Sequence, residues 1–292
     1  MPQIALYFLA LISLSTAPNW AKLNEMPAEV LGFWRLSLAS IIVLFFLFGI
    51  KKQKVDLLSK NAKWLAATGF FFFLHLWTYK WASKNALVSN MMILFATNPI
   101  WSSLGGVLFF NEPIKKRMVF SYVTAFVGIG LLVYDKIDIS NPNSLGNWVA
   151  LVSAFFYAVY MLYSKKARQY YDNSTVAGFQ YLVAAICFGL AVFIEKKALF
   201  SESYHSVSWI AVGGLILFPT FLGHMSLTYL VKNMNISILT CGKLIEPVLA
   251  SIFAYILFKE ELSSMAYVAF ALTAFSVLIL FWPDIKRYRF NK

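Results

Sequence analysis

A lysine and a glutamate stand three residues apart in a stretch hydrophobic enough to lie in a bilayer. Lys243 and Glu246 share one face of a helix, and Pro247 follows directly. Ionisable groups at membrane depth are costly, so they usually pair or line a cavity. The two residues form either a structural ion pair that ties this helix to a neighbour, or a site in which Lys243 binds an anionic group and Glu246 binds a cation or a proton. Buried ion pairs stabilise poorly by themselves, which favours the binding site.

Polar and aromatic side chains in other apolar spans are further candidates. His75 and His224 lie near the middle of their spans. Each is either a neutral histidine bonded to a neighbouring helix or a group that contacts substrate or exchanges a proton. Rings at this depth mostly pack, but they also stack on ligands or face cations. Together these residues predict a cavity for a zwitterion with an apolar or aromatic side chain. The remaining candidates for substrate binding are Tyr79, Asn98, Trp101, Tyr157 and Tyr160.

Arg35 lies a few residues into its span, on the side expected to face outward. Its long stem allows the guanidinium to reach that interface. Alternatively the side chain faces the cavity and binds substrate. Both interpretations stay open.

The segment around Pro247 has a counterpart 148 residues earlier, at Pro99. A glutamate follows each proline at the same spacing, Glu112 in the first copy and Glu260 in the second. Glu112 precedes a proline suited to the first turn of a helix, so we expect Glu112 to cap that helix. We interpret both prolines and both glutamates as structural or gating residues.

The shared offset indicates a duplication into two repeats, residues 1–137 and 138–292. Small residues recur at matching positions in the two copies. They predict a close approach of the two helices that carry them, because small side chains let backbones meet. These residues are Ser102 and Gly106 in the first copy, Ala250 and Ala254 in the second.

Composition defines the class of protein in which these residues act. The chain is 60% hydrophobic with a mean hydropathy of +0.68 and only 13% charged residues, which excludes an ordinary soluble domain. At about 20 residues per span, the length accommodates about ten helices and no large soluble domain. Apolar stretches fall near residues 3–21, 29–50, 64–83, 86–110, 118–134, 146–164, 175–194, 207–230, 236–258 and 265–283.

Basic residues in the loops predict the orientation. Sixteen lysines and arginines fall in loops that are inside if both termini are cytoplasmic, against seven in the outer loops. Five helices per repeat is an odd number, so the second repeat enters the membrane inverted. Inverted repeats place a substrate site near the midplane and open it to each side in turn. The expected fold is therefore an all-α integral membrane protein with ten transmembrane helices in two inverted five-helix repeats.

Known catalytic and nucleotide motifs are missing from the sequence. It contains no H-E-x-x-H, no G-x-x-x-x-G-K-[ST] and no G-x-S-x-G. The two cysteines, Cys187 and Cys241, fall inside apolar spans, which disfavours a disulfide framework or a metal cluster. We expect no catalytic residues, no cofactor and no metal site.

Several of these features together resemble the drug/metabolite transporter superfamily, in its ten-helix EamA-type form. The similar features are Phe33-Trp34-Arg35-Leu36 in the second span, the Pro99–Glu112 segment and the Glu246–Glu260 segment. The resemblance covers essentially the whole chain, although no second arginine matches Arg35. It implies export or exchange of small metabolites, often amino acids or drugs. It also implies a cavity lined mainly by the third, fourth, eighth and ninth spans, with the fifth and tenth peripheral.

The resulting hypothesis is a secondary transporter that exports a small metabolite such as an amino acid. Glu246 is its candidate coupling residue, because burial opposes ionisation of the carboxylate while the Lys243 ammonium favours it. The expected partners are a small-molecule substrate, a coupled proton or cation and the lipid bilayer, with no nucleic acid. We expect a monomer or homodimer in the cell (inner) membrane. The alternative is a membrane scaffold or sensor on the same fold, which would have no reason to keep polar residues in apolar helices.

Overall fold

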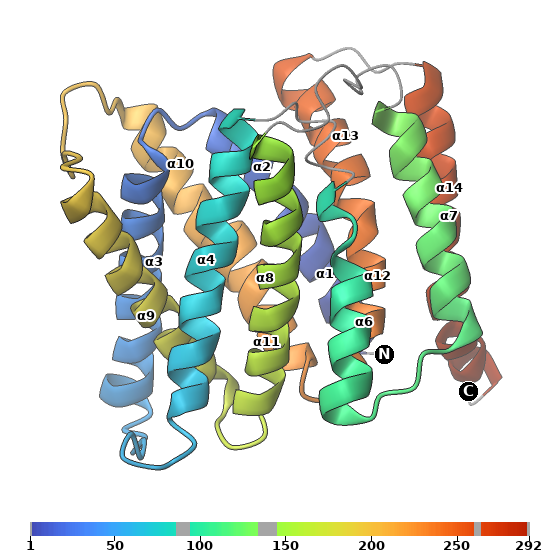
Figure 1. Cartoon of the computed structure of the whole chain (residues 1–292), viewed down its shortest axis with the longest axis horizontal. Helices are drawn as coiled ribbons and strands as arrows, with labels where there is room; N and C mark the ends of the chain where they lie inside the picture. The colour runs from blue at the N-terminus through green and yellow to red at the C-terminus, as the bar shows by residue number, and fades with distance from the viewer. Residues whose placement is uncertain (1, 86–93, 134–144, 260–263, 291–292) are drawn as a thin grey trace.

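The structure is a computed structural model that describes residues 2–85, 94–133, 145–259 and 264–290. Within these ranges every regular element is helical, and the helices form ten rods that run side by side (Figure 1). The rods are α1 (Pro2–Ser15) with α2 (Ala17–Lys22); α3 (Ala28–Leu44) with the π-helix η1 (Phe45–Ile50); α4 (Lys63–Asn85); α6 (Asn98–Phe110); α7 (Lys116–Val133); α8 (Leu145–Ala167); α9 (Asn173–Ile194); α10 (Ser206–Leu215) with the π-helix η3 (Ile216–Met225) and α11 (Ser226–Leu230); α12 (Ile236–Gly242) with the 3₁₀ turn η4 (Lys243–Ile245) and α13 (Glu246–Phe258); and α14 (Ser264–Phe290).

Six helical segments within the described residues are long and apolar enough to cross a membrane. The expected ten-helix, all-α membrane fold is confirmed, and most rods fall within a few residues of the predicted spans, whereas α6 begins later and α14 ends later than predicted. Part of the predicted fourth span, residues 86–93, lies outside the described residues, as does the predicted repeat boundary at 137/138. The six segments are Gln3–Lys22, Ala28–Ile50, Leu145–Ala167, Asn173–Ile194, Ser206–Leu230 and Ile236–Phe258.

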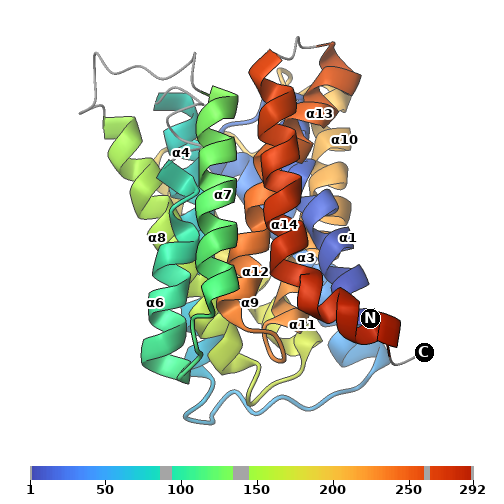
Figure 2. The same cartoon turned by 90° about the vertical axis from the view of Figure 1, so that its right-hand side faces the viewer.

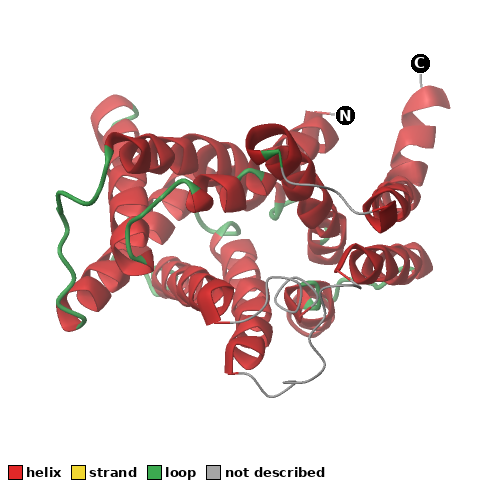
Figure 3. Ribbon diagram, turned by 90° about the horizontal axis from the view of Figure 1, so that it is seen from above, coloured by secondary structure: helices red, strands yellow, loops and turns green. Residues whose placement is uncertain are grey.

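Contacts between the rods follow a two-fold exchange of the two halves. α3 packs on α9, α6 on α12, and α7 on α14, so each of these rods meets its own counterpart five rods later. The contact of α4 with α8 likewise corresponds to the contact of α1 with η3 when the halves are exchanged. α7 and α14 stand together at one side of the bundle (Figure 2), and the C-terminal helix lies at its edge when seen from above (Figure 3).

The backbone repeats at the residue level as well. Asn111 directly follows α6 and Lys259 directly follows α13, and these two residues are 148 positions apart. Both residues adopt the left-handed conformation, with φ of 52° and 56°. Side chains other than glycine and asparagine rarely accept this conformation, so its recurrence at one offset reflects the duplicated architecture.

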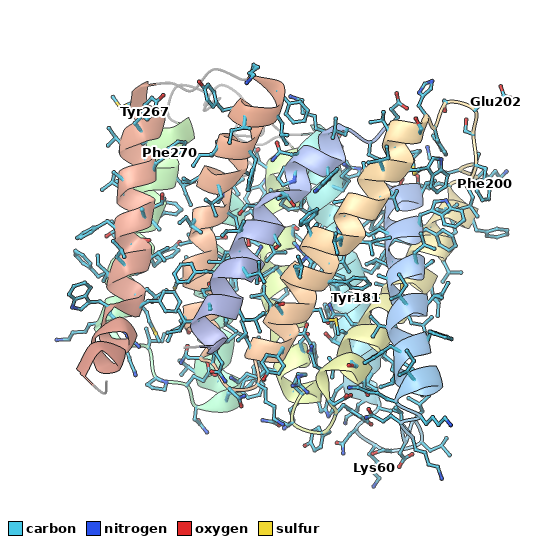
Figure 4. All side chains as sticks on the ribbon, turned by 180° about the vertical axis from the view of Figure 1, so that it is seen from behind. Lys60, Tyr181, Phe200, Glu202, Tyr267 and Phe270 are labelled. Carbon is cyan, nitrogen blue, oxygen red and sulfur yellow. The ribbon has the colours of Figure 1, made fainter. Side chains whose placement is uncertain are left out.

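The two ends of the bundle differ in which loops they carry. The loop that contains Lys60 lies at one end, and Phe200 and Glu202 lie toward the other, as does Tyr267 (Figure 4). Both termini lie toward the Lys60 end (Figure 1). The loops that supply most of the basic residues therefore share one end with the termini, as the charge pattern requires.

Glu112 fastens three segments at the Lys60 end. Its carboxylate lies 2.5 Å from Lys165 Nζ at the end of α8, and both side chains are only 11% exposed. Lys165 also donates to the carbonyl oxygens of Val231 and Met234, at 3.0 and 2.9 Å. The second Glu112 oxygen accepts the backbone N–H of Ile236, the first residue of α12, at 2.8 Å. We call this set of contacts the Glu112 latch.

The prediction that Glu112 caps the helix after Pro113 is wrong in its target. That helix, α7, begins only at Lys116. Glu112 instead satisfies an N–H at the start of α12, where Asn235 already accepts the N–H groups of Ser237 and Ile238. A helix N-terminus carries unpaired N–H groups and a partial positive charge, which a buried carboxylate satisfies. The matching glutamate, Glu260, lies outside the described residues.

The small residues of the two repeats meet different neighbours. A Cβ on Gly106 would lie 2.8 Å from Ile236 Cγ2 and 3.0 Å from a Glu112 carboxylate oxygen, so α6 and α12 do approach closely there. Ser102 is fully buried one turn earlier. In α13, the carbonyl of Ala250 accepts a hydrogen bond from Asn19 of α2 instead, and Ala254 is half-buried. The close approach of the fourth and ninth spans thus involves α12 rather than α13.

Replacing Gly106 by leucine should lower the thermal stability of the purified protein. The added side chain overlaps Ile236 and pushes on the Glu112 latch, and overpacking of this kind typically costs about 1–3 kcal/mol. Gly130→Leu on α7 is the matched control, because a Cβ there has no neighbour within 4 Å. Melting curves in detergent that show equal losses for the two variants would contradict the close α6–α12 contact.

Candidate functional site

The site is built on a break in the rod formed by α12, η4 and α13. Pro247 has no N–H, so the carbonyl of Lys243 cannot accept the usual bond from four residues later. It accepts the N–H of Glu246 instead, which tightens Lys243–Ile245 into a 3₁₀ turn. Pro99 acts at the equivalent place, since it is the second residue of α6 as Pro247 is of α13. Both chain breaks therefore fall at matching depth.

Lys243 and Glu246 form a buried ion pair at this break. Lys243 Nζ lies 2.9 Å from Glu246 Oε2, and the side chains are 7% and 18% exposed. The ammonium also faces two rings, with 4.3 Å to the centroid of Tyr157 and 5.2 Å to that of Phe95. Glu246 Oε1 is buried without a hydrogen-bond partner. The pair thus keeps one acceptor free, which a purely structural ion pair would be expected to satisfy.

Phe95 is the repeat counterpart of Lys243, 148 residues earlier. The cation of one repeat therefore rests on the ring that occupies its own position in the other repeat. Asn98, the counterpart of Glu246, donates to the Phe95 carbonyl at 2.9 Å. Its side-chain oxygen is buried and unpaired. The two breaks meet face to face, and each contributes one unsatisfied oxygen.

His75 joins this group from α4. Its ring lies 5.5 Å from Phe95 in a stacked arrangement and 5.1 Å from Tyr157 edge-on. Nδ1 is 3.2 Å from the hydroxyl of Ser153 on α8. Tyr79, one turn along α4, packs on both His75 and Phe95, at 5.9 and 5.1 Å.

Tyr160 links the two histidines. Its ring stacks on His75 at 6.0 Å, and its hydroxyl lies 3.1 Å from Nδ1 of His224. Phe72 packs against His224 at 4.9 Å. Both histidines are thus bonded to α8, the geometry expected of a neutral structural histidine. Their contact with substrate stays a prediction.

Arg35 lies inside the bundle, so the alternative that it reaches the interface is wrong. The residue is 8% exposed, and Nε donates to the hydroxyl of Thr220 at 2.7 Å. The preceding residue, Pro219, has no N–H to donate to the carbonyl of Leu215 as an α-helix would require, and the Thr220 hydroxyl donates to that carbonyl at 2.8 Å. Tyr181, in the bundle interior (Figure 4), donates to the Thr220 carbonyl at 3.0 Å. A sequence-encoded irregularity in η3 therefore positions Arg35.

Trp101 packs away from the other candidate residues, and its contact with substrate stays a prediction. Its ring packs at a right angle on Phe155 of α8, 5.7 Å between centroids. Phe155 is two residues from Tyr157, which places them on nearly opposite sides of a helix. The structure thus brings together Lys243, Glu246, His75, Tyr79, Tyr157 and Tyr160, continues through His224 to Arg35, and sets Asn98 beneath Phe95; Trp101 stands apart.

Four contributors were missed by the sequence reasoning: Phe95, Ser153, Tyr181 and Thr220. Phe95 was available from the 148-residue offset applied to Lys243, and Thr220 from its place after Pro219. Ser153 and Tyr181 carry no local signal. Among the described residues no group of three or more His, Cys, Asp or Glu could hold a metal ion, and both cysteines are free.

Comparisons with known proteins agree with this architecture. The model of the EamA-like transporter family matches residues 1–134 and 144–282. An uncharacterized transporter of Synechocystis sp. is 21% identical over 214 residues, which is 70% of this chain and 61% of that protein. The chain therefore spans less than two thirds of that relative's length. A crystal structure with 17% identity superposes with a TM-score of 0.80 over 96% of each chain, which supports the fold. Because the family model matches almost the whole chain, once in each half, the protein belongs to the EamA-like transporter family.

Proposed function

We propose that this membrane transporter exports a small metabolite with a zwitterionic group, such as an amino acid, by alternating access. The observation that carries the proposal is the buried Lys243–Glu246 pair, with its unpaired Glu246 oxygen and its aromatic surroundings. Its two charges are complementary to the carboxylate and the ammonium of a zwitterion. A cargo of this kind replaces the pair's mutual contact with two new ones, so that neither charge stays buried and uncompensated.

The rings around the pair suit the rest of such a cargo. Tyr157, Phe95 and His75 form a continuous surface next to the Lys243 ammonium. Tyr79, Tyr160 and His224 extend it along α4, α8 and η3. Flat rings bind apolar groups by burial and cations by their faces, while hydroxyls and imidazoles at their edges orient polar atoms.

Alternating access is supported by how the structure closes. Lys243, His75 and Arg35 are each less than 9% exposed, so cargo reaches them only when rods move. The Glu112 latch joins α8, the loop before α12 and α12 itself at the Lys60 end. Opening that end requires these contacts to break. The breaks at Pro99 and Pro247 lie between the latch and the opposite end, where they serve as hinges.

The proposed orientation follows from the charge bias. Both termini and the Lys60 loop are cytoplasmic, and the protein resides in the cell (inner) membrane. The coupling ion in this scheme is a proton carried by Glu246, since this carboxylate keeps one oxygen without a partner.

Replacing Glu246 by glutamine should abolish pH-driven accumulation of amino acids in proteoliposomes. Glutamine keeps the shape and a hydrogen-bonding group but cannot exchange a proton. Glu202→Gln is the matched control, because Glu202 is exposed in a loop at the end opposite Lys60. Uptake of radiolabelled amino acids at several imposed pH gradients measures the effect. An unchanged pH dependence in the Glu246 variant would make the residue a structural partner of Lys243.

Replacing Lys243 by methionine should weaken binding instead of uncoupling it. The change removes the partner for an anionic cargo group, and losing a hydrogen bond to a charged group costs roughly 1.5–3 kcal/mol, or on the order of tenfold to a hundredfold in affinity. Lys197→Met, at an exposed lysine, is the control. Equal amino-acid affinities for wild type and Lys243→Met, measured by scintillation proximity on purified protein, would rule out Lys243 as the anion site.

Reporter fusions test the orientation. A fluorescent protein that folds only in the cytoplasm should be active at the C-terminus and inactive when inserted after Glu202, because these positions lie at opposite ends of the bundle. The reverse pattern would invert the proposed topology and with it the meaning of export.

A further inference from the structure

We propose that Arg35 binds a carboxylate of the cargo, so that the cargo carries one more negative charge than positive charges. The inference rests on the proposed transport function and narrows its substrate class. The expected cargo is then an acidic amino acid, or another small metabolite with the same charges, instead of a zwitterion with an apolar side chain.

The guanidinium of Arg35 is buried and has few partners. The residue is only 8% exposed, and its only described hydrogen bond runs from Nε to the neutral hydroxyl of Thr220. Nη2 is buried without any partner. Arginine stays protonated in proteins, so the group cannot shed its charge as a buried lysine or histidine does.

The described ionisable groups that neighbour Arg35 do not offset its charge. The ionisable side chains that interact electrostatically with Arg35 are Tyr181 and Tyr160, and both are neutral at physiological pH. Arg35 also interacts electrostatically with His224 and His75. Among the described residues no carboxylate pairs with Arg35. The other buried cation of the site, Lys243, is already matched by Glu246. Of these two cations of the site, Arg35 therefore has no described counter-charge, and a carboxylate of the cargo would supply one.

A chain of contacts joins Arg35 to the proposed cargo site at Lys243. Arg35 is bonded to Thr220, and His224 lies one helical turn further along the same rod. His224 meets Tyr160, whose ring lies 5.1 Å from that of Tyr157, and Tyr157 faces Lys243. A row of tyrosine and histidine rings in mutual contact thus connects Thr220, the partner of Arg35, with Lys243. A carboxylate at Arg35, added to a carboxylate at Lys243 and an ammonium at Glu246, gives the cargo the charge of an acidic amino acid.

Thr220 orients the guanidinium of Arg35. The Thr220 hydroxyl donates to Leu215 and accepts from Arg35, so it holds Nε and leaves the other edge of the planar fork uncommitted. Two parallel N–H groups of a guanidinium can bind one carboxylate, and this edge is available for such a bidentate pair. The π-helical winding of η3 that positions Thr220 is rare in proteins and is frequently found at functional sites.

Buried Arg168 offers a matched control. It is 5% exposed, but its guanidinium donates to the carbonyl oxygens of Thr228 and Tyr171, at 3.1 and 2.6 Å. It is a structural arginine at the Lys60 end, where it ties α8 to neighbouring backbone. Arg168→Gln should therefore lower the melting temperature of the ligand-free protein. Arg35→Gln should leave it equal or raise it, because the variant removes an uncompensated buried charge.

The test uses sodium acetate as the probe, the smallest carboxylate, against sodium chloride at the same ionic strength. Acetate should raise the melting temperature of the purified wild type and of Arg168→Gln, and should have no effect on Arg35→Gln, since ligands of the folded state stabilise it. Three results overturn the anion site: a wild type that does not respond, a response that persists in Arg35→Gln, or a ligand-free Arg35→Gln as destabilised as Arg168→Gln. Stabilisation by chloride equal to that by acetate overturns the assignment to a carboxylate, because an inorganic anion then serves Arg35.

A second arm compares L-glutamate with L-glutamine, which have nearly the same shape and differ by one charge. Wild type should bind glutamate more tightly, on the order of tenfold to a hundredfold, as expected for a hydrogen-bonded charge pair. Arg35→Gln should bind the two alike. Glutamine bound as well as glutamate by wild type overturns the inference while the amino-acid transporter stands. If neither amino acid binds but the acetate response depends on Arg35, the amino-acid cargo is refuted and the carboxylate site is supported.

Discussion

Two missing backbone N–H groups organise this molecule. Pro99 and Pro247 each remove one helical hydrogen bond at the same depth of their rods, and the rods that carry them, α6 and the α12–α13 rod, are repeat counterparts in contact with each other. Within lipid an interrupted ladder survives only where protein covers it. Lys243 and Phe95 each lie four residues before one of these prolines, and the Lys243 ammonium lies 5.2 Å from the centroid of the Phe95 ring, so the two interruptions meet at this contact. The ion pair, the histidine on Phe95 and the tyrosines of α8 then have a fixed frame around which to pack.

Three buried or nearly buried charged groups show three degrees of compensation. Lys165 is fully engaged by Glu112 and two backbone carbonyls, and Glu112 also holds a helix N-terminus. Lys243 has one carboxylate and two rings, with one Glu246 oxygen to spare. Arg35 has only a hydroxyl. Because desolvation of a charge costs several kcal/mol unless it is offset by partners, compensation decreases from the closed end of the bundle to the part proposed to receive cargo. The charged groups that lack partners therefore indicate where cargo is expected to bind.

Much of the fold could be predicted from the sequence, because hydropathy and the 148-residue offset are properties of contiguous residues. The ninth span, predicted as 236–258, matches the structure at both ends. The candidate site was predictable as a set of polar residues at membrane depth but not as a set of contacts. Glu112 was assigned to the helix next to it in sequence, whereas the N–H it satisfies belongs to Ile236, 124 residues away. Trp101 was placed in the cavity by depth alone, and depth does not say which side of α6 faces inward. Long-range partners of this kind depend on how rods rotate about their axes, which no local pattern encodes.

The short helix α12 connects the latch to the site. It contains only the seven residues Ile236–Gly242, with the Glu112 carboxylate on its first N–H and the Pro247-induced 3₁₀ turn directly after its last residue. Tyr7 of α1 donates to its Leu239 carbonyl at 2.6 Å, and a side chain on Gly242 would collide with the same tyrosine. Seven helical residues thus separate the N–H held by Glu112 from the lysine that faces Phe95 and Tyr157. We therefore expect a displacement of Ile236 from Glu112 to move Lys243 relative to these rings, which would couple closure of this end of the bundle to the cation site.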